Sequence, residues 1–429
     1  MAPQGHGLKR DMPTLAPATA IAPVQTRWIA YARDAAIAAS CANLFSTALA
    51  NVALFVWMVM FICALAGPER RNLAWTTFPR GVAVAIALYL GWQALGMAYT
   101  DAPLAYAWGS LYADRKILYI LPLALLFGPE APRRRFLAAF LATCTVALAL
   151  SFLLLVPGIR NPLGRLPTEV LHSHVTQGMA FAMAAFLSLW FMSQAADRRR
   201  RAFFLLLALA FLVNIVTITT GRSGYVVFLV FIVASYGFWR GPRGILLGIG
   251  AAALLSVTVF YASSTVRDRV MLGVDEATHY MELTEETSLG RRALLYHVTL
   301  ELIAEHPVLG TGTGSFKERF SSTVASRYSD WKALPFHDPH NQYLFLWTEN
   351  GLPGLALFLF LLFSLYRGCD KTHPYGRMAA ACLLAWCTTS LFSGHFRTFP
   401  EGHMIAFVLG ALMTRLQPEP PAAEAPAWR

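Results

Sequence analysis

Charged residues are scarce in this sequence. Only 14% of its 429 residues are Asp, Glu, Lys or Arg, whereas soluble globular proteins carry about 25%. Hydrophobic residues make up 56%, so a water-soluble fold would have to leave large apolar patches in solvent. The apolar residues also gather in runs of roughly 18 to 24, the length that an α-helix needs to cross a bilayer. The sequence therefore predicts an all-α polytopic membrane protein.

Cysteine is also sparse, and its placement excludes two further classes. The six cysteines include no CxxC pair, and none lies in the longest polar segment, so neither a disulfide framework nor a cysteine metal site is predicted. Residues 1–28, rich in Pro and Ala, lack the apolar core and cleavage site of a signal peptide. We interpret this segment and residues 417–429 as disordered cytoplasmic tails.

Twelve apolar segments are candidate membrane spans. Residues 29–262 hold nine of them and residues 342–416 hold the other three. Eleven spans is the alternative count, because Arg33 and Asp34 weaken the first segment and the fourth is short. The twelve segments are residues 29–47, 50–66, 79–98, 115–128, 136–156, 174–193, 202–220, 223–239, 244–262, 342–366, 376–393 and 402–416.

The distribution of arginine predicts the orientation. The net charge is +11, and the dense arginine clusters lie in short loops between apolar segments. If the N-terminus is cytoplasmic, all of these loops fall on the cytoplasmic side, as the positive-inside rule requires. We therefore predict that both termini are cytoplasmic. The run Arg198–Arg201 is interpreted as a topology signal rather than a nucleic-acid site.

Residues 263–341 form the one long segment on the opposite side of the membrane. Within it, residues 291–305 place Leu295, Val298, Leu302 and Ile303 on one helical face, which predicts an amphipathic helix. Pro307 and the glycines that follow should end it. We expect this helix to lie over the bundle rather than to form a separate domain.

Several arginines lie on the non-cytoplasmic side, where the positive-inside rule does not require them. Arg222 stands in a tight glycine-flanked turn, TTGRSG, between two apolar segments. A cation at that depth needs a partner, and interfacial snorkelling or a structural ion pair is one explanation. The other is an anion site, because guanidinium groups match phosphate oxygens. The further candidates for such a site are Arg160, Arg165, Arg291 and Arg292.

A second polar group lies where the long segment enters the tenth span. It contains His337, Asp338, His340, Asn341 and Gln342. A histidine in a partly dry site can act as a general base, although capping of the helix is the alternative. The two histidines and one aspartate are an incomplete metal-ligand set. Gly351 and Pro353 shortly afterwards predict a bend at the start of this span, of the kind tolerated beside a cavity.

Three stretches resemble the O-antigen ligase and O-antigen polymerase superfamily of bacterial envelope glycosyltransferases. They are TTGRSG (219–224), GRRALLYHVTLELIAEHPVLGTGTGSF (290–316) and HNQYLFLWTENGLPGLALF (340–358). The spacing of the family pattern is met by Arg292, Tyr296, Pro307, Gly310 and Gly312, and then by His340, Asn341, Gly351 and Gly354. The sequence departs from it at Gly221, where serine is usual, and at Tyr296, where tryptophan is usual.

The resemblance implies a GT-C-like enzyme in the bacterial inner membrane, acting on the periplasmic side. The donor is then an undecaprenyl-pyrophosphate-linked glycan and the acceptor the lipid A–core oligosaccharide. His340 is expected to be the general base, and Arg222 and Arg292 to stabilise the pyrophosphate, helped by Arg160, Arg165 and Arg291. His337, Asp338, Asn341 and Gln342 would support the site. A single displacement predicts inversion at the anomeric carbon, without a metal or other cofactor, by a monomer.

Three alternatives stay open at the sequence level. An O-antigen polymerase would use similar motifs but a second lipid-linked glycan as acceptor. A protein O-oligosaccharyltransferase would modify a protein, but relatives of that kind carry a larger outer domain than residues 263–341 allow. A non-enzymatic transporter would have ionisable residues at several mid-membrane positions and inverted sequence repeats, and neither feature is evident.

Overall fold

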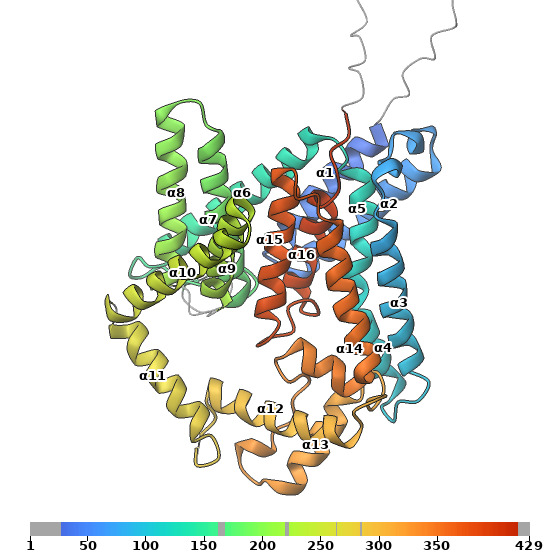
Figure 1. Cartoon of the computed structure of the whole chain (residues 1–429), viewed down its shortest axis with the longest axis vertical. Helices are drawn as coiled ribbons and strands as arrows, with labels where there is room; N and C mark the ends of the chain where they lie inside the picture. The colour runs from blue at the N-terminus through green and yellow to red at the C-terminus, as the bar shows by residue number, and fades with distance from the viewer. Residues whose placement is uncertain (1–26, 162–167, 219–222, 263, 284, 419–429) are drawn as a thin grey trace, which may run out of the picture.

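The computed structural model describes residues 27–161, 168–218, 223–262, 264–283 and 285–418. These residues form helices joined by loops, and none of them is in a β-strand (Figure 1). The α-helices are α1 (Arg27–Ala42), α2 (Thr47–Ala66), α3 (Arg80–Gly96), α4 (Leu104–Asp114), α5 (Ile120–Leu126), α6 (Glu130–Leu153), α7 (His174–Gln194), α8 (Arg198–Thr217), α9 (Ser223–Arg240), α10 (Pro242–Ala262), α11 (Ser264–Thr278), α12 (Ser288–Glu305), α13 (Phe316–Arg327), α14 (Gln342–Gly368), α15 (Pro374–Thr389) and α16 (Phe399–Leu412). Short 3-10 helices are η1 (Pro68–Asn72), η2 (Trp75–Thr77), η3 (Arg115–Tyr119) and η4 (Trp331–Ala333).

Every predicted span overlaps at least one helix, and the all-helical membrane class is confirmed. Seven helices in the described part of the chain are long and apolar enough to cross a bilayer: α2, α6, α7, α8, α9, α10 and α14. The fourth predicted span is instead divided between η3 and the seven-residue α5, which is too short to cross alone. The count of twelve spans therefore stays a prediction.

Helix α16 lies at the centre of the bundle. All of its residues from Pro400 to Leu412 are buried, including the polar side chains of Glu401 and His403, so the bundle surrounds this helix on every face. It packs against α5 and α15. Its C-terminal carbonyl groups are held by Arg133, a buried side chain that donates hydrogen bonds to the carbonyl oxygens of Leu412 (3.2 Å) and Thr414 (2.7 Å). These bonds satisfy groups that a helix end otherwise leaves unpaired.

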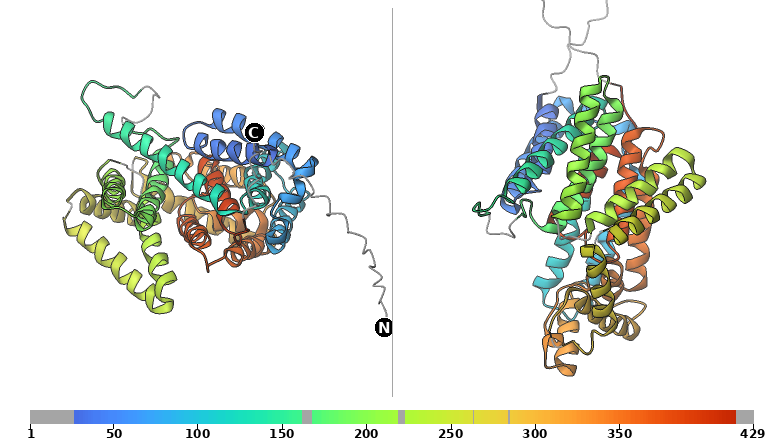
Figure 2. Two further views of the ribbon diagram at one scale, coloured as in Figure 1. Left: turned by 90° about the horizontal axis from the view of Figure 1, so that it is seen from above. Right: turned by 90° about the vertical axis from the view of Figure 1, so that its left-hand side faces the viewer.

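Helix α10 lies at the outer edge of the bundle (Figure 2). Its buried residues are Gly244, Gly248 and Ala252, which are small and let α10 approach α9 closely. The remaining surface of α10 is mainly apolar and exposed, and large side chains such as Leu246 and Leu254 point outward. An exposed apolar surface of this kind fits a bilayer rather than water.

The segment from α11 to η4 lies at one end of the molecule, opposite the α7–α8 turn and the described ends of the chain (Figure 1). The predicted amphipathic helix is confirmed as α12, and Leu295, Val298, Leu302 and Ile303 are all buried. The glycine-rich turn after it is tied to the bundle, since the N–H of Thr313 donates to the carbonyl oxygen of Gly96 (3.2 Å). This turn therefore has a structural role.

The predicted bend in the tenth span is also confirmed. Gly351, inside α14, has φ 66° and ψ −169°, a conformation that interrupts the helix. A Cβ atom there would lie 2.1 Å from the carbonyl oxygen of Val308, so only glycine fits. The bend brings residues 308–310 into contact with the first turns of α14, which follow the polar loop at residues 334–341.

Candidate functional site

Two of the predicted arginines, Arg165 and Arg222, lie outside the described residues. Arg160 lies exposed on the loop that follows α6. Arg291 and Arg292 are both on α12, one residue apart and therefore on different sides of the helix. Arg291 forms an ion pair with Glu286, and its guanidinium lies over the ring of Phe336 at 5.3 Å.

His340 is held by Asp338 within the 334–341 loop. The Oδ1 atom of Asp338 accepts a hydrogen bond from the backbone N–H of His340 (2.7 Å) and lies 3.2 Å from its imidazole Nδ1. His340 has φ 53°, the one positive φ at a non-glycine residue in the described chain, and these contacts maintain it. A proton on Nδ1 facing the carboxylate leaves Nε2 as the proton acceptor.

The pKa of Asp338 reflects this contact. Burial alone would raise it, but the hydrogen bonds and charge of His340, with a smaller contribution from Arg397, lower the pKa below its usual value. Asp338 is therefore a carboxylate at neutral pH. A fixed carboxylate on one ring nitrogen orients the imidazole and stabilises it when it takes up a proton.

Helix α12 adjoins the same loop. The hydroxyl oxygen of Tyr296 lies 2.8 Å from the carbonyl oxygen of Leu391 and 3.4 Å from that of His340. Arg292 is four residues before Tyr296 and so shares its helical face. Burial raises the pKa of the Tyr296 hydroxyl, and the nearby charge of Arg292 partly offsets the effect. The structure thus brings the side of α12 that carries Arg292 next to His340.

His395, in the connection between α15 and α16, is a neighbour that sequence analysis did not identify. Burial lowers its pKa to about 4, against the opposing charge of Glu401, and the positive charge of Arg292 lowers it further. Its ring is 1% exposed. His395 is therefore a neutral imidazole beside the candidate site.

Asn341 and Gln342 have different roles. The side-chain oxygen of Asn341 accepts hydrogen bonds from the N–H groups of Tyr343 (3.0 Å) and Leu344 (3.2 Å), so Asn341 caps α14. Gln342 is 1% exposed, and neither polar atom of its side chain has a hydrogen-bond partner among the described residues. His337 lines two adjoining cavities, and Asn341 and Gln342 line one of them.

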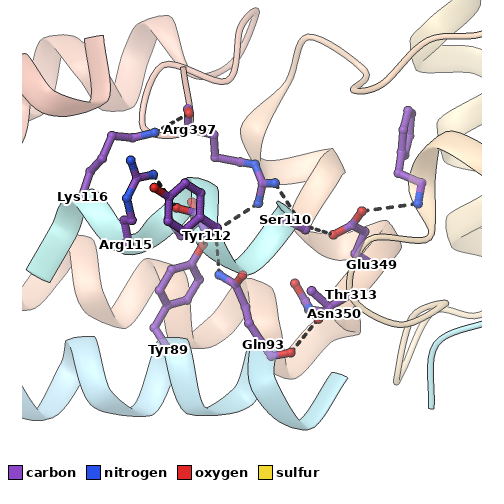
Figure 3. Close-up of polar contacts among 12 residues, drawn as sticks. Tyr89, Gln93, Ser110, Tyr112, Arg115, Lys116, Thr313, Glu349, Asn350 and Arg397 are labelled. Atoms are coloured by element: carbon purple, nitrogen blue, oxygen red, sulfur yellow. Dashed lines mark hydrogen bonds and ion pairs between the residues drawn. The ribbon is translucent and has the colours of Figure 1, made fainter. Parts of the chain in front are cut away.

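A buried charge cluster beneath these cavities was missed by sequence analysis. We define it as Ser110, Asp114, Glu349 and Arg397 (Figure 3). The guanidinium of Arg397 donates to Asp114 Oδ2 (2.9 Å) and to Ser110 Oγ (2.9 Å), and Ser110 Oγ donates to Glu349 Oε2 (2.9 Å). The cluster joins α4, α14 and the α15–α16 connection, and it places two carboxylates around one guanidinium.

Two cavities lie above this cluster and a third lies elsewhere. The first two, of about 270 and 290 Å³, share His337, Phe345 and Arg397 in their walls. The third, of about 650 Å³, is formed by apolar residues of α8, α9, α10 and α11, including Val216 and Tyr225. No group of three or more His, Cys, Asp or Glu that could hold a metal occurs in the part of the chain that the structure describes.

Comparison with known proteins places this region in a family. Residues 207–359 match the sequence model of the O-antigen ligase family. A protein of Rickettsia bellii named "Putative polysaccharide ligase" is 37% identical over 85 residues, 19% of this chain and 21% of the relative. A protein of the same kind from Rickettsia conorii is 28% identical over 116 residues, 26% of this chain and 28% of the relative.

An uncharacterized protein of Haemophilus influenzae is 30% identical over 123 residues, 28% of this chain and 30% of the relative. The matched segment thus spans less than a third of each of these relatives. The matched family region contains α12, the 334–341 loop and the bend in α14. The resemblance predicted from the sequence is therefore confirmed over residues 207–359, which match the O-antigen ligase family model.

Proposed function

We propose that this protein transfers a glycan from undecaprenyl pyrophosphate to a hydroxyl of the lipid A–core oligosaccharide, the ligase step of lipopolysaccharide biosynthesis. One observation carries the proposal: His340, held by Asp338, lies beside the α12 face that bears Arg292. A base and a guanidinium at one site are what transfer from a sugar diphosphate requires. The match to the ligase family over the same residues supports it.

His340 is the general base in this proposal. Its Nε2 takes the proton of the acceptor hydroxyl while that oxygen attacks the anomeric carbon of the donor sugar. The bond between the anomeric carbon and the phosphate oxygen breaks, and undecaprenyl pyrophosphate leaves with the bonding electrons. A single displacement of this kind inverts the anomeric configuration. Asp338 acts through His340, because it holds the ring and stabilises the imidazolium.

Arginine supplies the positive charge for the leaving pyrophosphate. We assign this role to Arg292 rather than Arg291, because Arg292 lies on the Tyr296 side of α12 whereas Arg291 pairs with Glu286. Arg222 is the second candidate, with Arg160 and Arg165 as helpers. Guanidinium groups aimed at the leaving oxygen stabilise the transition state more than the ground state, so no metal is needed.

The apolar cavity between α8 and α11 supports a lipid-linked donor. Val216 and Tyr225 line it, and they flank residues 219–222, which include Arg222, in the sequence. A polyprenyl chain in this cavity would carry its pyrophosphate toward that segment. In the proposed orientation, the end of the bundle with α12 and α13 faces the periplasm, and both chain ends are on the cytoplasmic side of the inner membrane.

The test is transfer by the purified full-length protein, with undecaprenyl-pyrophosphate glycan as donor and EDTA present. Lipid A–core, a second lipid-linked glycan and a protein are offered as acceptors. We expect transfer to lipid A–core, with loss of activity in His340→Ala and Arg292→Gln. His279→Ala and Arg327→Gln, which change exposed or half-exposed residues elsewhere in the α11–η4 segment, are the matched controls.

Each other outcome rejects a stated part of the proposal. Growth of the lipid-linked glycan without transfer to lipid A–core would identify a polymerase. Full activity in His340→Ala would exclude His340 as the base. Complete loss of activity with EDTA, restored by a divalent cation, would exclude a metal-independent reaction.

A further inference from the structure

The two cavities that share His337, Phe345 and Arg397 form one polar recess, which we call the acceptor recess. Its walls come from α4, residues 314–317 at the start of α13, the 334–341 loop, the first two turns of α14 and the α15–α16 connection. We infer that this recess holds the acceptor sugar that carries the attacking hydroxyl, and that the carboxamide of Gln342 binds two hydroxyl groups of that sugar. This inference rests on the proposed function.

Gln342 is the residue that points to a ligand. It lines the recess and is 1% exposed, yet its side-chain nitrogen and oxygen both lack a partner in the described part of the chain. A buried polar group without a partner costs free energy, so native proteins keep few of them. A carboxamide offers N–H donors and a carbonyl acceptor together. Two hydroxyl groups on neighbouring sugar carbons match both.

The rest of the recess also suits a sugar ring. Tyr106 and Phe345 line its walls with aromatic side chains, and Asn341 and Lys317 add polar groups. The recess thus combines apolar contact surface with several fixed polar groups.

The charge of the recess distinguishes it from a pyrophosphate site. The guanidinium of Arg397 already donates to Asp114 and Ser110, and the carboxylate of Glu349 lies next in the same network (Figure 3). Lys317 adds a second cation to the walls, but Asp338 adds a third carboxylate, so little positive charge is left for a dianionic group. The recess therefore favours a hydroxylated ring, and the donor pyrophosphate belongs with Arg292.

The recess adjoins the proposed base. Asp338 and Asn341, on either side of His340 in the sequence, both line it. Asp338 is also the residue that contacts the imidazole Nδ1. A sugar bound by Gln342 is therefore presented to the loop that carries His340, and binding there would select which hydroxyl meets the base.

The test compares Gln342→Met, which keeps the length and removes the amide, with Gln194→Met at an exposed position on α7. Initial rates are measured with varied lipid A–core at saturating donor, and with varied donor at saturating lipid A–core. For Gln342→Met we expect the KM for lipid A–core to rise about tenfold or more, because two hydrogen bonds are lost. The KM for the donor and the values for Gln194→Met should change less than about threefold.

A panel of core oligosaccharides, each lacking one hydroxyl, gives a second measurement. At least one deoxy acceptor should lose affinity with the wild-type protein and show no further loss with Gln342→Met. If Gln342→Met fails to fold, Gln342→Glu replaces it, and we expect the same rise in KM for lipid A–core. An unchanged KM for lipid A–core, or a rise confined to the donor, would overturn the assignment.

Failure of the proposed function gives a different result. If wild-type protein transfers nothing, direct binding of lipid A–core in the absence of donor still tests the recess. Binding that Gln342→Met weakens about tenfold supports the recess as a lipid A–core site. Equal binding by both proteins rejects it.

Discussion

Removing Arg397 should destabilise the protein strongly, because this side chain is the cation of a buried cluster. The Arg397 side chain is 15% exposed and that of Asp114 is 3% exposed. The pair joins the α15–α16 connection to α4 across 2.9 Å. Arg397→Gln would remove the guanidinium that is hydrogen-bonded to Asp114 and Ser110 and leave the carboxylates of Asp114 and Glu349 buried without it, which is more costly than loss of one hydrogen bond.

The expected size follows from how buried ion pairs behave. Removing one partner of such a pair costs about 3–5 kcal/mol, since the other charge is left uncompensated. Asp114→Asn should cost less, about 1.5–3 kcal/mol, because an asparagine oxygen still accepts hydrogen bonds from Tyr89 and Gln93. The double variant removes both charges. We therefore expect it to be about 1–3 kcal/mol less destabilised than the sum of the single variants.

The assay is equilibrium unfolding of the purified protein in mixed micelles, with helicity followed as denaturing detergent is added. Wild type, both single variants and the double variant are compared as a double-mutant cycle. Arg327→Gln, which disrupts an exposed ion pair, is the control and should cost less than about 1 kcal/mol. Strict additivity within about 0.5 kcal/mol, or a cost for Arg397→Gln no greater than that of the control, would refute the reasoning.

Three further results are expected. In initial-rate assays of transfer, His340→Ala should lower kcat about 10²- to 10⁴-fold. Asp338→Asn should lower kcat by a smaller factor. Equal losses of kcat in the two variants would mean that Asp338 does more than position the ring. Gly351→Ala should lower the unfolding free energy by about 1–3 kcal/mol because its φ is 66° and a Cβ would meet a carbonyl oxygen, whereas Gly250→Ala, which meets nothing, should not.

The third expected result is a dependence of the unfolding free energy on pH. The pKa of His395 falls from its usual 6.5 to about 4 on folding, so the folded protein binds fewer protons than the unfolded chain below pH 6.5. Stability should therefore decline as pH falls from 6.5 to 4, by about 3 kcal/mol in all. His395→Asn should remove this decline in unfolding titrations, and a decline that persists unchanged would assign it to other groups.

Local patterns predicted the elements that depend on neighbouring residues. The face of α12 could be predicted because four apolar residues recur with helical spacing, and the bend in α14 because Gly351 and Pro353 interrupt an apolar run. The division of the fourth span into η3 and α5 was not predicted. Pro122 in this segment is a local signal for it, because proline cannot donate the backbone hydrogen bond of a continuous helix.

Contacts between side chains far apart in the chain could not be predicted from the sequence. Arg397 and Asp114 are 283 residues apart, and nothing local to either predicts that they meet. Arg133 lies in one of the arginine clusters between apolar segments, which predict orientation only, but its side chain is buried and binds the carbonyl groups at the end of α16. The Asp338–His340 contact spans two residues, yet it depends on a positive φ that composition does not reveal.

The central place of α16 has a consequence for biosynthesis. The ribosome reaches residues 399–412 only after it has made every helix that packs around them. Until then α5 and α15 lack the partner that fills the space between them, and Arg133 lacks the carbonyl groups that it binds. The helices made before α16 must therefore remain in the bilayer as an incompletely packed bundle until α16 is inserted. Assembly of the described bundle then requires the insertion into its middle of a mainly apolar helix that also carries Glu401 and His403.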